Sequence, residues 1–312
     1  IQAKEIEKLK QQNKQLESQQ RNTIQNNTNS QEESSINILD SNQIKEYEKV
    51  KELGQGANGT VQEVTKKELY VFKELNNLNT DSFRDLLKEY EILNQIHHPN
   101  IIKTYGIYFG DKTTPPTIVL EHCTQNIDAA INNKSLSGPQ IVSSIYQIAE
   151  GMKYVHFLKL IHRDLKPSNI VIAKDGTIKI CDFGLCKVFD SNSTKSSMTK
   201  GIGTLFFMAP EIINEEEYDE IVDVYSFGVL VFFILSGGQM PKIKIPEICS
   251  GKKAIIPKEI SKFSNELINS CWNFEPSERP TFEEICNDII NNKFQLINGI
   301  DENDPIIQKH LK

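Results

Sequence analysis

A short stretch of this chain carries acids, an amide and a lysine at spacings that suit magnesium binding and phosphoryl transfer. Asp164, Lys166 and Asn169 lie within one run of six residues, and Asp182 follows Asp164 by 18 positions. Oxygen ligands such as the Asn169 amide and the Asp182 carboxylate suit Mg²⁺, and phosphoryl transfer needs divalent ions to neutralise the polyphosphate. Asp164 could orient a substrate hydroxyl, with the Lys166 cation two positions away.

These residues stand in two motifs that resemble a known family. The chain reads His-Arg-Asp-Leu-Lys-Pro-Ser-Asn over residues 162–169 and Asp-Phe-Gly over residues 182–184. Taken singly, each motif is better explained by a polar turn, because Asp and Gly favour turns for local reasons. Together they resemble the catalytic loop and the magnesium loop of eukaryotic protein kinases. The implied roles are catalysis for Asp164 and Lys166 and metal binding for Asn169 and Asp182.

Composition limits the class of protein. The chain has 312 residues, 38% apolar and 25% charged, which is ordinary for a soluble globular protein. Its net charge of −7 disfavours nucleic acid as a partner. The six cysteines lack the paired spacing of a zinc site or a disulfide framework, so we expect a reduced, cytoplasmic setting. The longest apolar run, residues 227–235, is about half of what a membrane-spanning helix requires, so no membrane span is expected.

The first 43 residues offer little that could build a core. Residues 1–20 carry apolar or amide residues at a 3–4 alternation. This pattern fits either the end of a coiled coil, which would allow a homodimer through an N-terminal helix, or a solvated, partly helical linker. The alternation is shorter than the roughly three heptads that would decide between them. Residues 21–43 are rich in Gln, Asn and Ser and predict a disordered linker.

Beyond about Tyr47 the pattern predicts two lobes. Short β-type runs at 50–53, 61–64 and 69–72 predict a small antiparallel sheet. A helix is expected at 81–96, strands at 101–109 and 117–121, and mostly helices after residue 127, including 221–235. The fold class is α+β, the bilobal protein-kinase fold, with an antiparallel-sheet N-lobe carrying one main helix and a larger, mainly helical C-lobe. We assign residues 44–298 to the kinase domain (N-lobe 44–120, hinge 121–126, C-lobe 127–298) and 299–312 to a C-terminal tail.

Residues 54–59 form a glycine-rich motif, Gly-Gln-Gly-Ala-Asn-Gly. In dinucleotide-binding folds such a motif precedes a helix, but here strand patterns flank it on both sides, and its Asn-Gly end is a hairpin signal. Alone it fits a plain hairpin equally well; in context it is similar to the kinase flap that covers the phosphates of ATP. The resemblance implies nucleotide contacts from Leu53, Gly54, Gln55, Gly56, Ala57, Asn58, Gly59, Thr60 and Val61.

Lys73 ends the third predicted strand, where a fixed ammonium could bind phosphates if an acid held it. Glu89 shares a helical stripe with Leu86 and Leu93, whereas Glu91 does not. The ordinary alternatives are an edge-strand lysine and a solvated helix face. The kinase pattern implies a Lys73–Glu89 pair with a catalytic role, and Glu91 is the weaker candidate.

Residues 118–123, Ile-Val-Leu-Glu-His-Cys, resemble the last strand of the small lobe and the hinge of kinases. By that resemblance Leu120 is the gatekeeper, and main-chain groups of Glu121 and Cys123 hydrogen-bond the adenine. Val71 and Val171 would line the adenine site. Val71 stands where the family usually has Ala, so we expect a bulkier wall there.

Residues 182–211 include several Ser and Thr and end in Ala-Pro-Glu. They resemble a kinase activation segment, in which a phosphate, preferably on Thr199, would pair with Arg163 and order the loop. An unmodified Ser/Thr-rich loop stays open as the alternative. By the same resemblance, Arg279 would pair with Glu211, and Asp223 would support the backbone of the 162–163 turn.

The chain is therefore identified as a member of the eukaryotic protein kinases over about residues 44–298. Lys166 and Thr204 are of the Ser/Thr type, while residues 223–228 and the Trp272 segment resemble the tyrosine-kinase-like group. The implied function is transfer of the γ-phosphate of ATP to Ser/Thr hydroxyls of protein substrates in intracellular signalling, with Mg²⁺, or alternatively Mn²⁺, as cofactor. A dual-specificity kinase and a nucleotide-binding scaffold of the pseudokinase kind are the alternatives.

Overall fold

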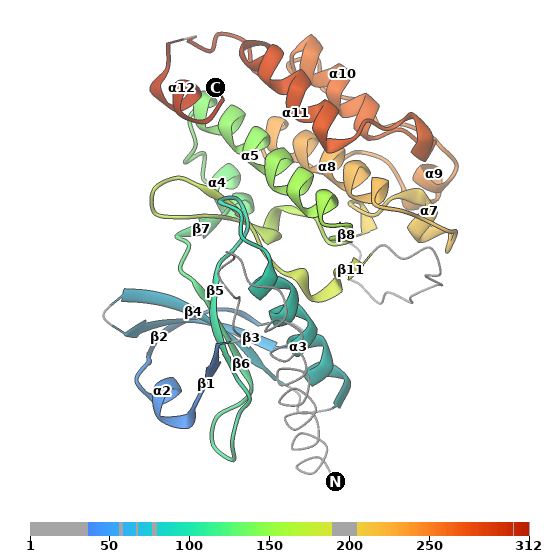
Figure 1. Cartoon of the computed structure of the whole chain (residues 1–312). Helices are drawn as coiled ribbons and strands as arrows, with labels where there is room; N and C mark the ends of the chain where they lie inside the picture. The colour runs from blue at the N-terminus through green and yellow to red at the C-terminus, as the bar shows by residue number, and fades with distance from the viewer. Residues whose placement is uncertain are drawn as a thin grey trace, which may run out of the picture. The chain divides into compact units, whose positions relative to one another are not determined.

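The computed structural model describes residues 37–55, 59–66, 68–76, 80–188, 205–301 and 303–311 (Figure 1). They form two compact units. The first comprises the described residues up to Gln95 together with Lys103–His122, and the second comprises Ile96–Ile102 and the described residues from Cys123 onward. Several predictions lie outside the described residues: the candidate coiled coil over 1–20, the flap residues Gly56, Ala57 and Asn58, and Thr199 and Thr204.

The first unit is built on a six-stranded sheet with the strand order β1-β5-β6-β4-β3-β2. The predicted strands are all present, as is the predicted helix, now α3. Every neighbouring pair is antiparallel except β1–β5, which is parallel and which the sequence did not predict. The elements are β1 (Ile38–Leu39), α2 (Ser41–Lys45), β2 (Glu48–Gln55), β3 (Gly59–Lys66), β4 (Glu68–Leu75), α3 (Thr80–Gln95), β5 (Thr104–Tyr108) and β6 (Thr117–Glu121).

Residues 37–43, the end of the linker expected over 21–43, are ordered: they contain β1 and the start of α2. Asp40 caps α2, because its carboxylate accepts the backbone N–H groups of Asn42 and Gln43. The Gln43 side chain in turn accepts the N–H of Asp40, which completes a capping box. Ile44 is buried. A five-residue helix with one buried apolar side chain is too short to produce a periodic signal in the sequence.

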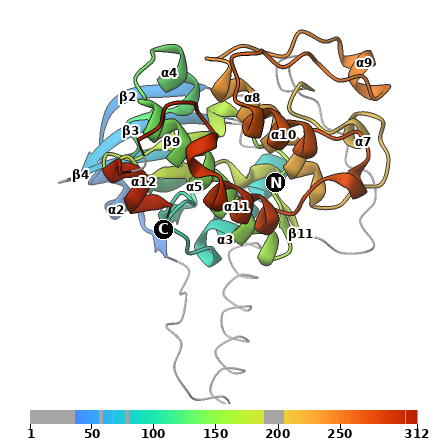
Figure 2. The ribbon, with the colours of Figure 1, turned by 90° about the horizontal axis from the view of Figure 1, so that it is seen from above.

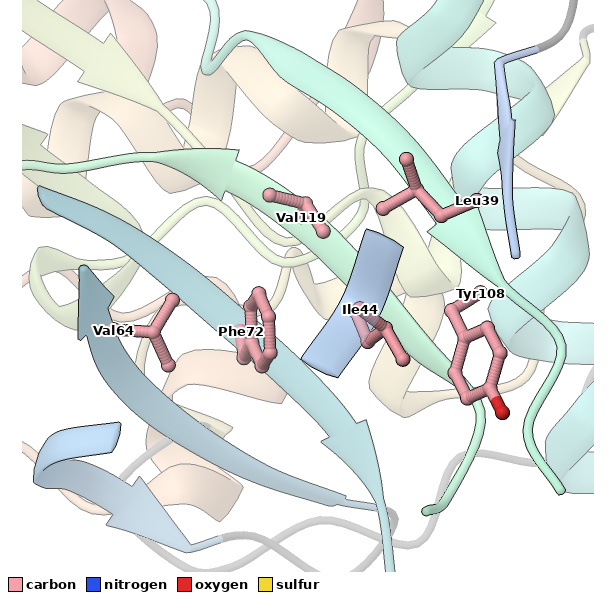
Figure 3. Close-up of a cluster of buried hydrophobic side chains, with 6 residues drawn as sticks. All are labelled: Leu39, Ile44, Val64, Phe72, Tyr108 and Val119. Atoms are coloured by element: carbon pink, nitrogen blue, oxygen red, sulfur yellow. The ribbon is translucent and has the colours of Figure 1, made fainter. Parts of the chain in front are cut away.

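Opposite faces of this sheet carry different side chains. Because side chains alternate along a strand, Phe72 and Lys73 of β4 point to opposite faces. The Phe72 face is covered by α2 and carries a buried hydrophobic cluster (Figure 3). On the Lys73 side lies α3, which contacts β4 and β5. The cluster consists of Leu39, Ile44, Val64, Phe72, Tyr108 and Val119.

The second unit is mainly helical, as predicted. α8 is buried on almost every side, and α11 and α12 pack along α5 (Figure 2). None of the helices within the described residues is both long and apolar enough to cross a membrane. The helices are α4 (Ile127–Asn132), α5 (Gly138–Phe157), α7 (Pro210–Ile213), α8 (Ile221–Leu235), α9 (Ile245–Cys249), α10 (Lys262–Cys271), α11 (Phe282–Asn291) and α12 (Pro305–His310). The strands are β7 (Gln125–Asn126), β8 (Leu160–Ile161), β9 (Ile170–Ile172), β10 (Ile178–Ile180) and β11 (Lys187–Val188).

Candidate active site

In the first unit the side chains of Lys73 and Glu89 form an ion pair. The Lys73 Nζ lies 2.6 Å from both Glu89 carboxylate oxygens. Lys73 comes from β4, and Glu89 comes from the α3 stripe that buries Leu86 and Leu93. The Lys73 side chain is 23% exposed and that of Glu89 only 4%. The structure therefore forms the pair that the sequence predicts, with the lysine end accessible, and leaves Glu91 outside it.

The described part of the glycine-rich motif lies in the β2–β3 hairpin. Gly54 is opposite Val61, and Gln55 is opposite Thr60, so the motif joins strand to strand as predicted. Gly59 faces β4 so closely that a Cβ atom there would collide with the carbonyl oxygen of Glu74. That approach requires glycine. Leu53, just before the motif, is exposed on β2.

The residues predicted around the adenine are divided between the units. In the first unit Val71 and Leu120 are neighbours across β4 and β6, and both are buried. The Glu121 N–H donates to the Lys103 carbonyl oxygen over 2.9 Å, which fixes the end of β6. In the second unit Cys123 and Val171 are both half-buried, and Val171 lies on β9.

In the second unit Asp164, Lys166 and Asn169 form one connected hydrogen-bond network. Asp164 Oδ2 accepts from Lys166 Nζ at 2.9 Å and from Asn169 Nδ2 at 3.0 Å. Asn169 Nδ2 also donates to the Asp164 carbonyl oxygen at 2.8 Å. Because these bonds use the amide nitrogen, the Asn169 Oδ1 atom is the one suited to a cation; the Ser168 Oγ approaches it only to 3.4 Å. The donor set fits Mg²⁺, which prefers oxygen ligands.

A small hairpin brings Asp182 to the same end as Asn169. β9 starts directly after Asn169 and pairs antiparallel with β10, with Ile170 opposite Ile180. The Cys181 N–H donates to the Asn169 carbonyl oxygen over 2.9 Å. Asp182 follows in the left-handed region, at φ 66° and ψ 67°. That backbone conformation is uncommon for a residue other than glycine, and such residues cluster at functional sites.

His162 links the loop to the hairpin. Its Nδ1 accepts the Asp164 N–H over 3.2 Å, and its Nε2 lies 3.2 Å from the Cys181 carbonyl oxygen. The ring packs edge-on against Phe183, with ring centroids 4.8 Å apart. Both nitrogens are therefore used, so this fully buried side chain fixes Asp164 relative to the segment after β10 that contains Asp182.

Asp223 of α8 supports the backbone of this loop. Its two carboxylate oxygens accept the N–H groups of His162 and Arg163, each over 2.8 Å. His156 of α5 adds a contact of 3.0 Å to Oδ2. Burial alone would raise the pKa of Asp223, but the hydrogen bond and charge of His156, with the His162 groups, outweigh burial and hold the pKa below its usual range. The predicted contact between Asp223 and the 162–163 turn is thus present. The Asp223 side chain is stabilised in its charged, carboxylate form.

Glu211 and Arg279 form the ion pair expected at the end of the segment 182–211. Two parallel bonds join them, at 2.5 and 2.9 Å, and both residues are buried. The Arg279 Nε donates to the Asn273 carbonyl oxygen at 2.8 Å, and the guanidinium lies 5.1 Å from the ring centre of Tyr225. Such bidentate geometry is specific to arginine.

The sequence missed the role of His156. Its partner Asp223 is 67 positions away, and a lone histidine on a helix carries no signal that distinguishes a buried support from a solvated side chain. The link through His162 between the loop and the hairpin was missed for a similar reason.

The paired lysine in the sheet-based unit and the Asp–Lys–Asn loop in the helical unit are both features of the protein kinase class. Comparison with known families agrees with this class. Residues 47–289 match the protein kinase domain, and the chain belongs to that family.

Similar proteins occur in Dictyostelium discoideum. A probable serine/threonine-protein kinase is 33% identical over 255 residues, which cover 77% of this chain and 15% of that protein. Dual specificity protein kinase shkE is 31% identical over 251 residues, covering 75% of this chain and 34% of shkE. Probable serine/threonine-protein kinase drkC is 32% identical over 227 residues, covering 68% of this chain and 30% of drkC. The matched region is therefore about a third or less of each of these relatives.

Proposed function

We propose that this chain is an active protein kinase that transfers the γ-phosphate of ATP to Ser and Thr hydroxyls of protein substrates. The observation that carries the proposal is the Asp164 carboxylate, which is held between Lys166 and Asn169. A pseudokinase usually lacks one of the residues at positions 73, 164 and 182, and this chain has all three. The names of its relatives point the same way.

Each residue has a defined task in this proposal. Lys73, held by Glu89, binds phosphate oxygens, and Asp164 orients the substrate hydroxyl and accepts its proton. Lys166 offsets negative charge on the transferred group. Asn169 Oδ1 and the Asp182 carboxylate would hold Mg²⁺, or Mn²⁺, which when bound neutralises the polyphosphate. Catalysis is then mainly positioning and electrostatic stabilisation.

The matched set of nucleotide contacts belongs to the same proposal. The β2–β3 hairpin would cover the phosphates with its backbone. Val61, Val71 and Val171 would contact the adenine, and main-chain groups of Glu121 and Cys123 would hydrogen-bond its edge. These assignments are supported by the kinase pattern of the sequence.

Dual specificity is the second candidate activity. It is favoured by the relative shkE, whose name describes a dual specificity protein kinase. Assignment to the tyrosine-kinase-like group rests on the sequence around residues 223–228 and Trp272. Phosphoamino-acid analysis of a labelled generic substrate distinguishes these activities: we expect phosphoserine and phosphothreonine, and a substantial phosphotyrosine fraction would favour the second candidate.

A cytoplasmic setting and a homodimer through residues 1–20 complete the proposal. The first rests on the cysteine pattern and composition, and the second on the 3–4 alternation of the N-terminal sequence. Concentration-dependent dimerisation, measured by sedimentation, should disappear when residues 1–20 are deleted. A monomer at all concentrations would contradict the dimer and leave the kinase assignment unaffected.

Transfer of labelled phosphate from Mg-ATP to a generic protein substrate tests the main proposal. Asp164→Ala should reduce transfer by about 10²–10⁴-fold, whereas the exposed Glu217→Ala variant should match the unmodified protein. If Asp164→Ala transfers phosphate as fast as the unmodified protein, the Asp164 carboxylate does not have the proposed role. No transfer by either purified protein would favour a nucleotide-binding scaffold.

A further inference from the structure

The segment 37–47, which we call the clasp, connects the two faces of the sheet in the first unit. It includes β1 and α2 and precedes β2. One end contacts α3, the helix that carries Glu89, and the other end is buried on the face opposite Lys73. All of these contacts lie within the first unit.

The first contact is between the clasp and Tyr90, the residue that follows Glu89. The Tyr90 side chain is fully buried. Its hydroxyl accepts the Asn37 N–H over 2.9 Å and donates toward the Asn37 carbonyl oxygen over 3.3 Å. Burial raises the pKa of Tyr90 to about 12, despite the bond to the Asn37 backbone. The hydroxyl therefore keeps its proton at physiological pH, and this single proton lies between two acceptors, the Asn37 carbonyl oxygen and the Asn94 Oδ1 atom at 3.4 Å.

Asn37 is in turn fixed to β5. Its carbonyl oxygen accepts the Ile107 N–H over 3.0 Å, and its side-chain amide donates to the Tyr105 carbonyl oxygen. Between these two residues, Gly106 comes so close that a Cβ atom would lie 2.7 Å from the Asn37 oxygen. The position needs glycine for this close approach. Asn37 thus bonds both to α3 and to β5.

The other end of the clasp is held by apolar packing. Leu39 and Ile44 belong to the buried cluster that contains Phe72 (Figure 3). The Tyr47 ring lies 5.0 Å from that of Phe72, centre to centre. Phe72 is the neighbour of Lys73 in β4. The clasp therefore runs from the residue after Glu89 to the residue before Lys73.

We propose that the clasp positions α3 so that Glu89 stays on Lys73, and that Tyr90 is a positioning residue for phosphoryl transfer. This inference rests on the proposed kinase function. The apolar contacts of α3, such as Phe83 against Phe109 just after β5, have little directional preference. The hydrogen bonds of Tyr90 are directional and lie one residue from the ion pair, so they restrict rotation and sliding of the helix.

Substitution Tyr90→Phe in the full chain tests the inference, because it keeps the ring and removes the hydroxyl. We expect kcat to fall by roughly tenfold or more, with little change in KM for the protein substrate. The reason is that a small displacement of a catalytic group strongly lowers the rate. Gly106→Ala, which displaces Asn37 from the other side, should act in the same direction. The control is Tyr154→Phe, whose ring stacks on His98 in the second unit. An unchanged kcat in both Tyr90→Phe and Gly106→Ala would overturn the inference.

A double-mutant cycle separates positioning from general stabilisation. If the clasp acts through Glu89, then Tyr90→Phe should add little to the loss already caused by Glu89→Gln. If Tyr90 only supports the fold, the two losses should multiply. Multiplying losses would therefore contradict the inference.

Hydrogen exchange of the α3 amides tests the clasp without reference to activity. Tyr90→Phe should raise exchange over residues 80–95 relative to Tyr154→Phe, while α8 exchanges as before. Unchanged exchange in α3 would contradict the inference that the clasp restrains this helix. Absence of phosphate transfer in the unmodified chain, with faster α3 exchange in the variant, would instead contradict the proposed function and leave the structural part of the inference standing.

Discussion

Asp223 in the second unit and Glu89 in the first are both buried carboxylates, yet they are held by different means. The Asp223 carboxylate accepts hydrogen bonds from two backbone N–H groups of the 162–163 turn. The His156 ring of α5 also contacts it. Glu89 pairs instead with a side chain, the ammonium of Lys73 on β4, which is partly exposed. The loop geometry in the second unit is therefore set by bonds that cannot be lost without disturbing the fold. The ion pair in the first unit depends on how a helix is held against a sheet.

Asp223→Ala should have the largest effect on the free energy of unfolding. It leaves the buried N–H groups of His162 and Arg163 without their acceptor, so we expect a loss of about 3–5 kcal/mol, together with loss of phosphate transfer. Urea denaturation measures the first quantity. The exposed Glu217→Ala should stay within about 0.5 kcal/mol of the unmodified protein. A similarly small change in the unfolding free energy for Asp223→Ala would show that Asp223 does not hold the loop of the second unit in the way described.

Arg279→Lys should come next. Lysine cannot reproduce the two parallel bonds to Glu211 or the Nε bond to the Asn273 carbonyl oxygen, so we expect a loss of about 2–3 kcal/mol. Thermal unfolding would report it as a lower Tm. As a control, Lys262→Arg alters an exposed pair with Glu266 at 3.8 Å and should change stability by less than about 0.5 kcal/mol. Equal effects of the two substitutions would contradict the importance of the buried pair.

Glu89→Gln should separate activity from stability. Gln keeps the shape of the side chain and can still accept a hydrogen bond from Lys73, which is 23% exposed. Loss of the charge should therefore lower the free energy of unfolding by about 1–2 kcal/mol, less than Asp223→Ala does. Phosphate transfer should still fall by roughly tenfold or more, since Lys73 is no longer fixed. Glu91→Gln, on the same helix, is the matched control and should retain transfer. A stability loss comparable to that of Asp223→Ala would show that the two carboxylates are held alike.

The smallest effect concerns His98, in the segment Ile96–Ile102 that the structure groups with the second unit. Burial lowers the pKa of His98, and Lys153 and Lys179 add to the effect while Glu150 opposes it. The unfolded chain therefore binds the proton first, and stability falls as the pH is lowered through about 6.5.

Substitution of His98 provides the test of this pH effect. His98→Gln should flatten the slope of unfolding free energy against pH between about 7.5 and 5.5, by less than about 1 kcal/mol in total. If His98→Gln leaves the slope of unfolding free energy against pH unaltered, His98 is not the source of the pH effect.

Local patterns predicted much of this arrangement. Strand and helix periods placed Lys73 at a strand end and Glu89 on the apolar stripe of a helix, and the resemblance to kinases implied that the two form a pair. The close spacing of Asp164, Lys166 and Asn169 predicted that they act at one site, but it did not predict the hydrogen bonds that join them. The two lobes followed from the change of period near residue 127.

Contacts between distant residues could not be predicted in this way. Asn37 and Tyr90 are 53 positions apart, and His156 and Asp223 are 67 apart, so no periodic pattern records either bond. The ordered residues 37–45 lie in a polar stretch, where one buried isoleucine does not alter the composition. Their order comes from a capping box and from apolar surface supplied by other strands, neither of which is visible within a short window.

The two-residue strand β1 has a consequence for self-association. Among the described strands, β2 and β1 are the outer ones of the sheet. β2 is exposed and alternates acids with lysines, Glu48, Lys49, Lys51 and Glu52 among them, and charges on an edge disfavour pairing with another chain. β5 has no such charges, and β1 covers it instead. A chain without Ile38 and Leu39 would keep its charged edge but would present an open template at β5, on which a strand from a second molecule could add.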